Sequence, residues 1–149
     1  MGNRAVITTS KALDVSASQE IGVYLHWNGG RDSVEAFLLY CKLKEYRPPE
    51  SDDYGWARLC QVIGNYFGGY CSIGINSCCC LDCNNYDNGV YVISNWKIVD
   101  RKYFRSNEQG RYDLFEMLCE INAAQPEKEQ LPADVLREAA QNFKRVKEN

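Results

Sequence analysis

The stretch from residue 21 to residue 44 constrains the fold most, because an alternating apolar run there meets a glycine turn and then an amphipathic helix. An alternation with a period of two residues is typical of a strand that buries one face. The residues expected on the buried side are Ile21, Val23, Leu25 and Trp27, and those on the other side are Tyr24 and His26. The turn that follows is Asn28-Gly29-Gly30, which ends the strand.

The helix after this turn carries its own start signal. Asp32 is followed three residues later by Glu35, a spacing that predicts a capping box with Asp in place of Ser. Helical spacing then places four apolar residues on one face, and these are Val34, Phe37, Leu38 and Cys41. This strand, turn and helix form the unit on which the rest of the chain is expected to pack.

The remaining elements follow from the same two periodicities and from turn residues. Strands are expected at 4–9, 71–75, 90–94 and 96–104, a second helix at 54–67, and two helices in the tail after residue 112. Residues 76–88 are expected to form a connection that closes in a hairpin turn at Asp87-Asn88-Gly89. The order ββ-αα-βββ-αα favours one α+β domain over 1–149, with a mainly antiparallel sheet of about five strands and about four helices.

Charge and composition exclude several classes of protein. A net charge of −3, from 20 acidic and 17 basic residues, is not the electrostatic footprint of a general nucleic-acid-binding protein. No apolar run approaches the roughly 18 residues of a membrane span, and the first residues lack the apolar core of a secretion signal. We therefore expect a cytoplasmic protein with no membrane partner. In that compartment the 8 cysteines are expected to remain free thiols.

The turn itself is the first candidate site. Unpaired N–H groups at a helix start, glycines that allow close approach and an arginine all suit a phosphate. The candidate ligand-binding residues are His26, Asn28, Gly29, Gly30, Arg31, Asp32 and Ser33. Their spacing resembles the SGGxDS loop of the PP-loop ATP pyrophosphatases, with Asn28 in place of the first serine. That resemblance implies a doubly wound parallel sheet, whereas here a second helix is expected after the first. A purely structural turn with a capped helix is the alternative.

His26 is the only histidine in the chain, so any mechanism that uses an imidazole must use this one. The spacing indicates neither an orienting acid nor a nucleophile. The alternative is a half-buried histidine that forms a hydrogen bond within the sheet.

The third candidate is a cluster of thiols on the connection after the third strand. The pair Cys80 and Cys83 has the spacing of a zinc knuckle, and Cys78, Cys71 or Asp82 is available as a further ligand. No second, similarly spaced pair exists to complete a structural zinc site. The alternative is a set of thiols that hold no metal.

Aromatic residues form the fourth signal, with 10 Tyr, 5 Phe and 3 Trp. Rings with a polar tip are frequent at interfaces and can stack on bases. The aromatic residues expected near turns and hairpins are Tyr66, Phe67, Tyr70, Tyr86, Tyr91, Trp96, Tyr103 and Phe104. These indicate a recognition surface, while the expected strand edges at 4–9 and 96–104 offer a way for copies of the chain to pair as a homo-oligomer.

Four segments together resemble a group of small proteins encoded by phages and prophages of Gram-positive bacteria. These segments read RAVIT, GVYLHWNGGRDSVEAFLLYCKL, DDYGWARLCQVIGNYFGG and DNGVYVISNWKIVDR, and they cover about the first two-thirds of the chain. The resemblance implies an accessory role in the host cell cytoplasm and supplies no catalytic residues. Small phage proteins of this size resemble inhibitors of bacterial immunity, such as anti-CRISPR proteins or sponges for nucleotide signals.

Three functional hypotheses follow. In the first, the chain is a non-catalytic inhibitor that binds a bacterial defence component, which is either a protein or a small nucleotide signal. In the second, it is a small nucleotide-handling enzyme that uses the turn at 28–33. In the third, it is a protein-interaction module stabilised by zinc.

Overall fold

The computed structural model describes residues 2–104 and 112–146, and within them one five-stranded sheet packs against helices. The strands are β1 (Ala5–Thr9), β2 (Ile21–Leu25), β3 (Ile73–Ser77), β4 (Val90–Ser94) and β5 (Lys97–Lys102). The α-helices are α1 (Arg31–Leu43), α2 (Asp53–Phe67), α3 (Leu114–Ala124) and α4 (Ala133–Asn142). Short 3-10 helices lie at Cys78–Cys80 and Glu127–Glu129. The α+β class and the element order are confirmed.

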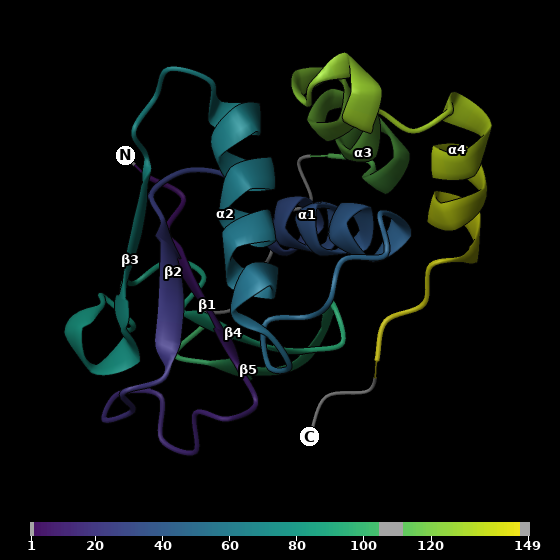
Figure 1. Ribbon diagram of the computed structural model, residues 1–149. Coiled ribbons are helices and arrows are strands. Elements are labelled where there is room, and N and C mark those ends of the chain that lie inside the picture. Colours follow the sequence, from purple (N-terminus) through teal and green to yellow (C-terminus); the bar gives the residue numbers. More distant parts are fainter. Residues whose placement is uncertain (1, 105–111, 147–149) are drawn as a thin grey trace.

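The sheet has the strand order β3-β2-β1-β4-β5, and Figure 1 shows the four described α-helices on one side of it, with α4 farthest from the strands. Strand β1 is central and all five of its residues are buried. It pairs with β2 antiparallel and with β4 parallel, so the sheet is mixed, although the other pairs are antiparallel. The expectation of an exposed edge at 4–9 was therefore wrong, and the edge strands are β3 and β5.

The core lies between the sheet and the helices. The predicted apolar face of α1 is confirmed, because Val34, Phe37, Leu38 and Cys41 are each at most 1% exposed. The opposite face of the sheet is covered by loops instead of helices, with Val6 and Val92 packing against Ala12, Val15 and Cys83. Burial on both faces explains why β1 is apolar or β-branched throughout.

The predicted hairpin turn at Asp87-Asn88-Gly89 was wrong, because β3 and β4 are not neighbours in the sheet. The hairpin lies one strand later, where Asn95 and Trp96 join β4 to β5 with φ values of 50° and 62°. Two successive left-handed residues form the turn type whose twist matches paired strands.

The predicted capping box of α1 was also wrong. The helix begins at Arg31 with Gly30 as its N-cap, so no side chain caps it from that position. Asp32 lies inside the first turn, where its Oδ1 accepts a hydrogen bond from the N–H of Ser33 at 2.8 Å. Glu35 accepts hydrogen bonds from Arg145 near the other end of the described chain, and along its own helix its carboxylate lies 3.6 Å from the Nε of Arg31.

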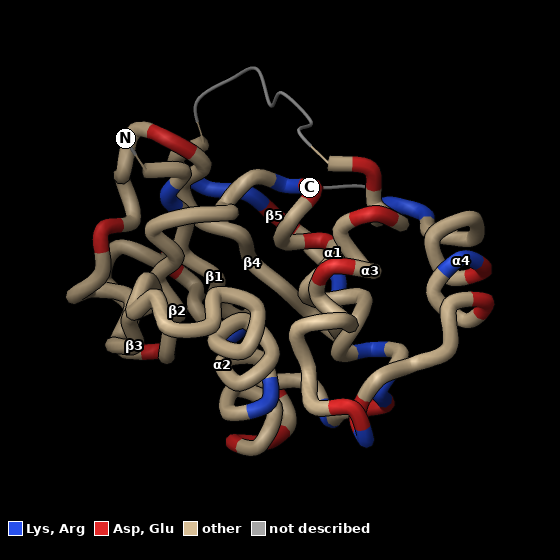
Figure 2. Tube along the Cα trace, turned by 90° about the horizontal axis from the view of Figure 1, so that it is seen from above, with Lys and Arg blue, Asp and Glu red and all other residues tan. Residues whose placement is uncertain are grey.

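Across the described residues, no helix combines the length and the apolar character needed to cross a membrane. Figure 2 shows Lys and Arg interspersed with Asp and Glu along the trace.

Candidate functional site: an aromatic pocket beside the glycine turn

The glycine turn owes its shape to Asn28, which has a φ of 55°. Asparagine tolerates this left-handed conformation better than most residues, because its short polar side chain can form local hydrogen bonds. Its Nδ2 donates to the hydroxyl of Ser33 at 3.3 Å and to that of Tyr66 at 3.4 Å. The asparagine therefore both turns the chain and ties the turn to α2.

Gly29 is packed against the first strand. A Cβ at this position would overlap the carbonyl oxygen of Asn3 and would lie 2.8 Å from the Cβ of Ala5. Its N–H donates to Asn3 O at 2.8 Å, and its carbonyl accepts from the Tyr91 hydroxyl at 2.7 Å. The missing side chain thus allows the approach of the protein's own backbone.

The rest of the turn is similarly engaged. Because the carboxylate of Asp32 accepts from Ser33 N–H, a negative charge already lies at the start of α1. The side chain of Arg31 is 12% exposed and its Nε lies 3.6 Å from the carboxylate of Glu35. This arrangement does not favour a phosphate at the turn, and it favours the structural alternative.

A pocket opens immediately beside the turn, with a volume of about 670 Å³. Small-molecule sites typically enclose roughly 300–1,000 Å³. Five aromatic side chains line it, and these are Trp27, Tyr66, Phe67, Tyr70 and Tyr112. The other lining residues are Asn3, Asn28, Ser72, Glu120 and Ala124. Of the predicted site residues, Asn28 is the one that the structure places in this pocket.

Several of the rings are fixed by their neighbours. Tyr66 meets Phe67 edge-on with 5.4 Å between ring centroids, and it meets Phe37 of the core at the same separation. Trp27 is 42% exposed, Tyr70 is 80% exposed and Tyr112 is 36% exposed, so these three are the most accessible rings of the wall. The expectation that Trp27 points inward with Leu25 was wrong, because β2 ends at Leu25 and the alternation ends with it.

Charge in the pocket comes from Glu120. Burial raises the pKa of the Tyr66 hydroxyl, the neighbouring Glu120 and Tyr112 raise it further, and a hydrogen bond from Asn28 acts in the opposite direction. The lining residues within the described part of the chain include no Lys or Arg. The pocket therefore offers ring faces and one carboxylate, which are favourable surroundings for a cation.

Sequence reasoning found Tyr66, Phe67 and Tyr70 as parts of a recognition surface, but it missed the contributions of Tyr112 and Glu120. Both come from the segment that enters and forms α3, which is distant in sequence from the turn. A hydrogen bond from the N–H of Tyr112 to Asp32 Oδ2, at 2.8 Å, joins that segment to α1. No local signal marks such a pairing.

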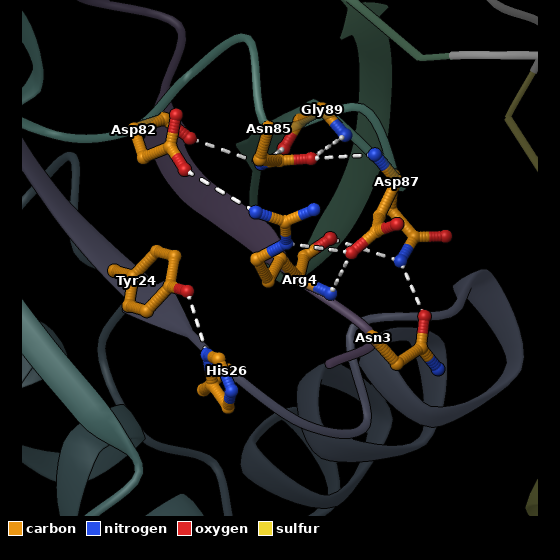
Figure 3. Close-up of polar contacts among 9 residues, drawn as sticks. Asn3, Arg4, Tyr24, His26, Asp82, Asn85, Asp87 and Gly89 are labelled. Carbon is orange, nitrogen blue, oxygen red and sulfur yellow. Dashed lines mark hydrogen bonds and ion pairs between the residues drawn. The ribbon is translucent and has the colours of Figure 1, made fainter. Parts of the chain in front are cut away.

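His26 lies outside the pocket, in a polar cluster at the end of β2 that Figure 3 shows. The hydroxyl of Tyr24 and the Nδ1 of His26 share a hydrogen bond of 2.9 Å, and the imidazole meets the Trp27 ring edge-on at 4.9 Å. Among the described residues, Tyr24 is the side chain hydrogen-bonded to this imidazole. The geometry favours the interpretation of His26 as a half-buried, hydrogen-bonded histidine.

In the same cluster Arg4 lies between two aspartates (Figure 3). Its Nε donates to Asp87 Oδ2 at 2.8 Å, and its Nη1 lies 3.9 Å from Asp82. Burial alone would raise the pKa of Asp87, but the hydrogen bonds and charge of Arg4, with a smaller contribution from His26, hold it below its usual value. This pair ties the start of β1 to the turn before β4.

We expect the contribution of the Arg4–Asp87 pair to stability to depend on pH in the acidic range. Because the folded pKa of Asp87 is lowered, its stabilising contribution is complete above the unfolded pKa of about 3.9 and is lost as pH falls through the folded value. Asp87→Asn should therefore destabilise the protein at pH 7, and its difference from wild type should shrink as pH falls below the unfolded pKa of about 3.9. Urea unfolding against pH measures this, with the exposed Glu138→Gln as control. A difference that does not depend on pH would contradict it.

The structure does not gather the predicted zinc ligands. All eight cysteines are free, and within residues 2–104 and 112–146 no group of three or more His, Cys, Asp or Glu is placed to hold a metal ion. Cys78 and Cys83 are buried, whereas Cys80 is exposed. Burial raises the pKa of Cys83 to about 11, and its Sγ donates to Cys78 O at 3.4 Å, so this thiol is engaged as a neutral donor.

Comparison with known proteins finds no matching protein family, no matching curated protein and no matching solved structure.

Proposed function

We propose that this chain is a non-catalytic binding protein that inhibits a bacterial defence protein, and that the aromatic pocket holds a cationic side chain of that target. The observation that carries the proposal is the lining of the pocket, with five aromatic residues and the carboxylate of Glu120. A guanidinium or ammonium group is attracted to the faces of aromatic rings and to a carboxylate. The link to bacterial defence rests on the resemblance of sequence segments to phage-encoded proteins.

The charge of the pocket favours a protein target over a nucleotide signal. Nucleotide signals carry phosphates, and sites for phosphates normally supply Arg, Lys or free N–H groups. The described lining contains none of the basic side chains, and the nearby start of α1 is engaged by Asp32. An arginine from a protein needs only ring faces and an acceptor, and arginine is enriched where interfaces gain most of their energy.

Trp27 gives a direct readout of this binding. It is 42% exposed and lines the pocket, whereas Trp56 is 8% and Trp96 is 3% exposed. A change in tryptophan fluorescence on adding a ligand therefore reports mainly on Trp27. Suitable probes are an acetylated hexa-arginine peptide for the cationic target, and ATP and a cyclic dinucleotide for the nucleotide signals.

We expect the arginine peptide to give a saturable signal that Glu120→Gln weakens about tenfold, because a charged hydrogen bond contributes about 1.5–3 kcal/mol and this carboxylate is partly solvated. The matched control is Glu116→Gln, an exposed carboxylate one turn earlier on α3 that does not line the pocket. Saturation by a nucleotide recovered intact would replace the protein target with a nucleotide signal. Conversion of the nucleotide would show that the chain is an enzyme. If Glu120→Gln and Glu116→Gln weakened peptide binding equally, the aromatic pocket would not be the binding site.

A further inference from the structure

The run Cys78-Cys79-Cys80 forms a 3-10 helix directly after β3. Successive side chains of a 3-10 helix point about a third of a turn apart, so three neighbours cannot share one direction. Cys78 points inward and is 1% exposed, while Cys79 and Cys80 are exposed. The sulfur atoms of the two exposed thiols lie 3.8 Å apart.

The backbone that carries these two thiols is anchored. The N–H of Cys78 donates to Glu20 O at 2.8 Å, and the N–H of Cys79 donates to Ser18 O at 2.9 Å. Beneath them, Cys78 packs so close to Gly22 that a Cβ on that glycine would lie 3.1 Å from its sulfur. The exposed pair is thus presented on a turn whose backbone position is fixed by the sheet.

We propose that Cys79 and Cys80 form a two-thiolate chelating site for a divalent thiophilic cation of the zinc and cadmium class. Sulfur bonds of about 2.3 Å at a tetrahedral angle put the two sulfur atoms about 3.8 Å apart, which matches their separation of 3.8 Å. Binding forms two metal–sulfur bonds and releases two protons to solvent, with no change of oxidation state. Water or donors from a partner complete the coordination.

A disulfide between the same two residues fits less well. Adjacent Cα atoms are about 3.8 Å apart, whereas most disulfides join Cα atoms separated by about 4.4–6.8 Å. The chelate places no such demand on the separation of the two Cα atoms. The proposed ligand set also differs from the zinc knuckle predicted from the sequence, since it uses Cys79 and does not use the buried Cys78 and Cys83.

Titration of the reduced full-length chain with cadmium, followed by sulfur-to-metal absorption, tests the site. We expect one ion per chain, with Cys79→Ser and Cys80→Ser each weakening binding at least tenfold. Cys71→Ser removes another exposed thiol and should leave binding unchanged.

Loss of binding in Cys83→Ala with retention in Cys79→Ser would restore the zinc knuckle and overturn the proposal. Circular dichroism checks that Cys83→Ala, which alters a buried position, remains folded. A wild-type signal no stronger than that of the Cys79→Ser/Cys80→Ser double variant would equally overturn it. Because the pocket is lined by other residues, neither outcome bears on the proposed binding function.

Discussion

Replacing Gly29 by alanine is expected to destabilise the fold by about 3 kcal/mol, near the upper end of the usual cost of overpacking. The added Cβ would overlap the carbonyl oxygen of Asn3, and it would lie 2.8 Å from Ala5 Cβ and 2.9 Å from the carbonyl carbon of Arg4. These atoms belong to the backbone, or are attached directly to it, at the start of the central strand. They cannot rotate away, so relief requires that β1 or the turn shift.

The neighbouring Gly30 supplies a matched control. A Cβ there would lie 3.0 Å from Asp32 Oδ1 and 3.6 Å from the side-chain nitrogen of Asn3. Both atoms are side-chain ends that can move, and the φ of Gly30 is −66°, which suits any residue. Gly30→Ala should therefore cost less than about 1 kcal/mol.

Urea unfolding of both variants decides between two interpretations of the same letters. If the glycines served to admit a phosphate, both substitutions would lower the affinity for a phosphate ligand. The free energy of unfolding would then not need to fall more in Gly29→Ala than in Gly30→Ala. If Gly29 serves the packing of the turn on β1, the loss of stability is confined to Gly29→Ala. Equal midpoints for wild type and Gly29→Ala would contradict the packing argument.

Strands β1 and β4 and helix α1 show which parts of the fold can be predicted from the sequence. Strand β4 was predicted with its observed bounds, 90–94, and the buried face of α1 was predicted residue by residue, because both depend on local periodicity. The parallel pairing of β1 with β4 joins segments far apart in sequence, so no local pattern reports it. The run from Ala5 to Thr9 did carry a signal of its own, since a strand without polar alternation is typical of burial on both faces.

The candidate site was predictable only in part, for a similar physical reason. The aromatic residues at the end of α2 follow from the sequence, but the pocket exists because α3 brings Glu120 opposite them. In the glycine turn the residue types suited a phosphate, yet they are equally required when the approaching group is the chain's own backbone. The residue that distinguishes a structural turn from a phosphate loop is Asn28, which stands in place of serine. Its left-handed φ of 55° favours Asn or Gly.

The second large effect is expected at Glu35, where the sequence and the structure assign different partners. The carboxylate is 6% exposed and accepts hydrogen bonds from Arg145 at 2.9, 2.9 and 3.2 Å, while Arg31 lies 3.6 Å away. Arg145 follows α4, so this contact fastens the end of the described chain to the first turns of α1. Removing one partner of a buried pair costs about 3–5 kcal/mol, since the remaining charge is left without compensation.

We expect Arg145→Ala to cost about 2 kcal/mol, less than that range, because the Arg145 side chain is itself 58% exposed and Arg31 remains beside the carboxylate. Glu35→Gln should cost a similar amount. The two effects should not add, because each variant removes the same charged contact, and a coupling of at least about 1 kcal/mol is expected in the double variant. Urea unfolding of the four proteins measures the cycle.

The control is Arg137→Ala, which removes an arginine from α4 that stacks on Phe115 at 5.1 Å, whereas the described partners of Glu35 are Arg31 and Arg145. It should show no coupling to Glu35→Gln. A capping box would make Glu35 a partner of its own helix start, and Arg145→Ala would then leave stability unchanged. Additive effects of Arg145→Ala and Glu35→Gln would therefore contradict a direct contact between these residues, which are 110 positions apart in the sequence. If the contact exists, either substitution alone removes it, and the second substitution has no contact left to remove.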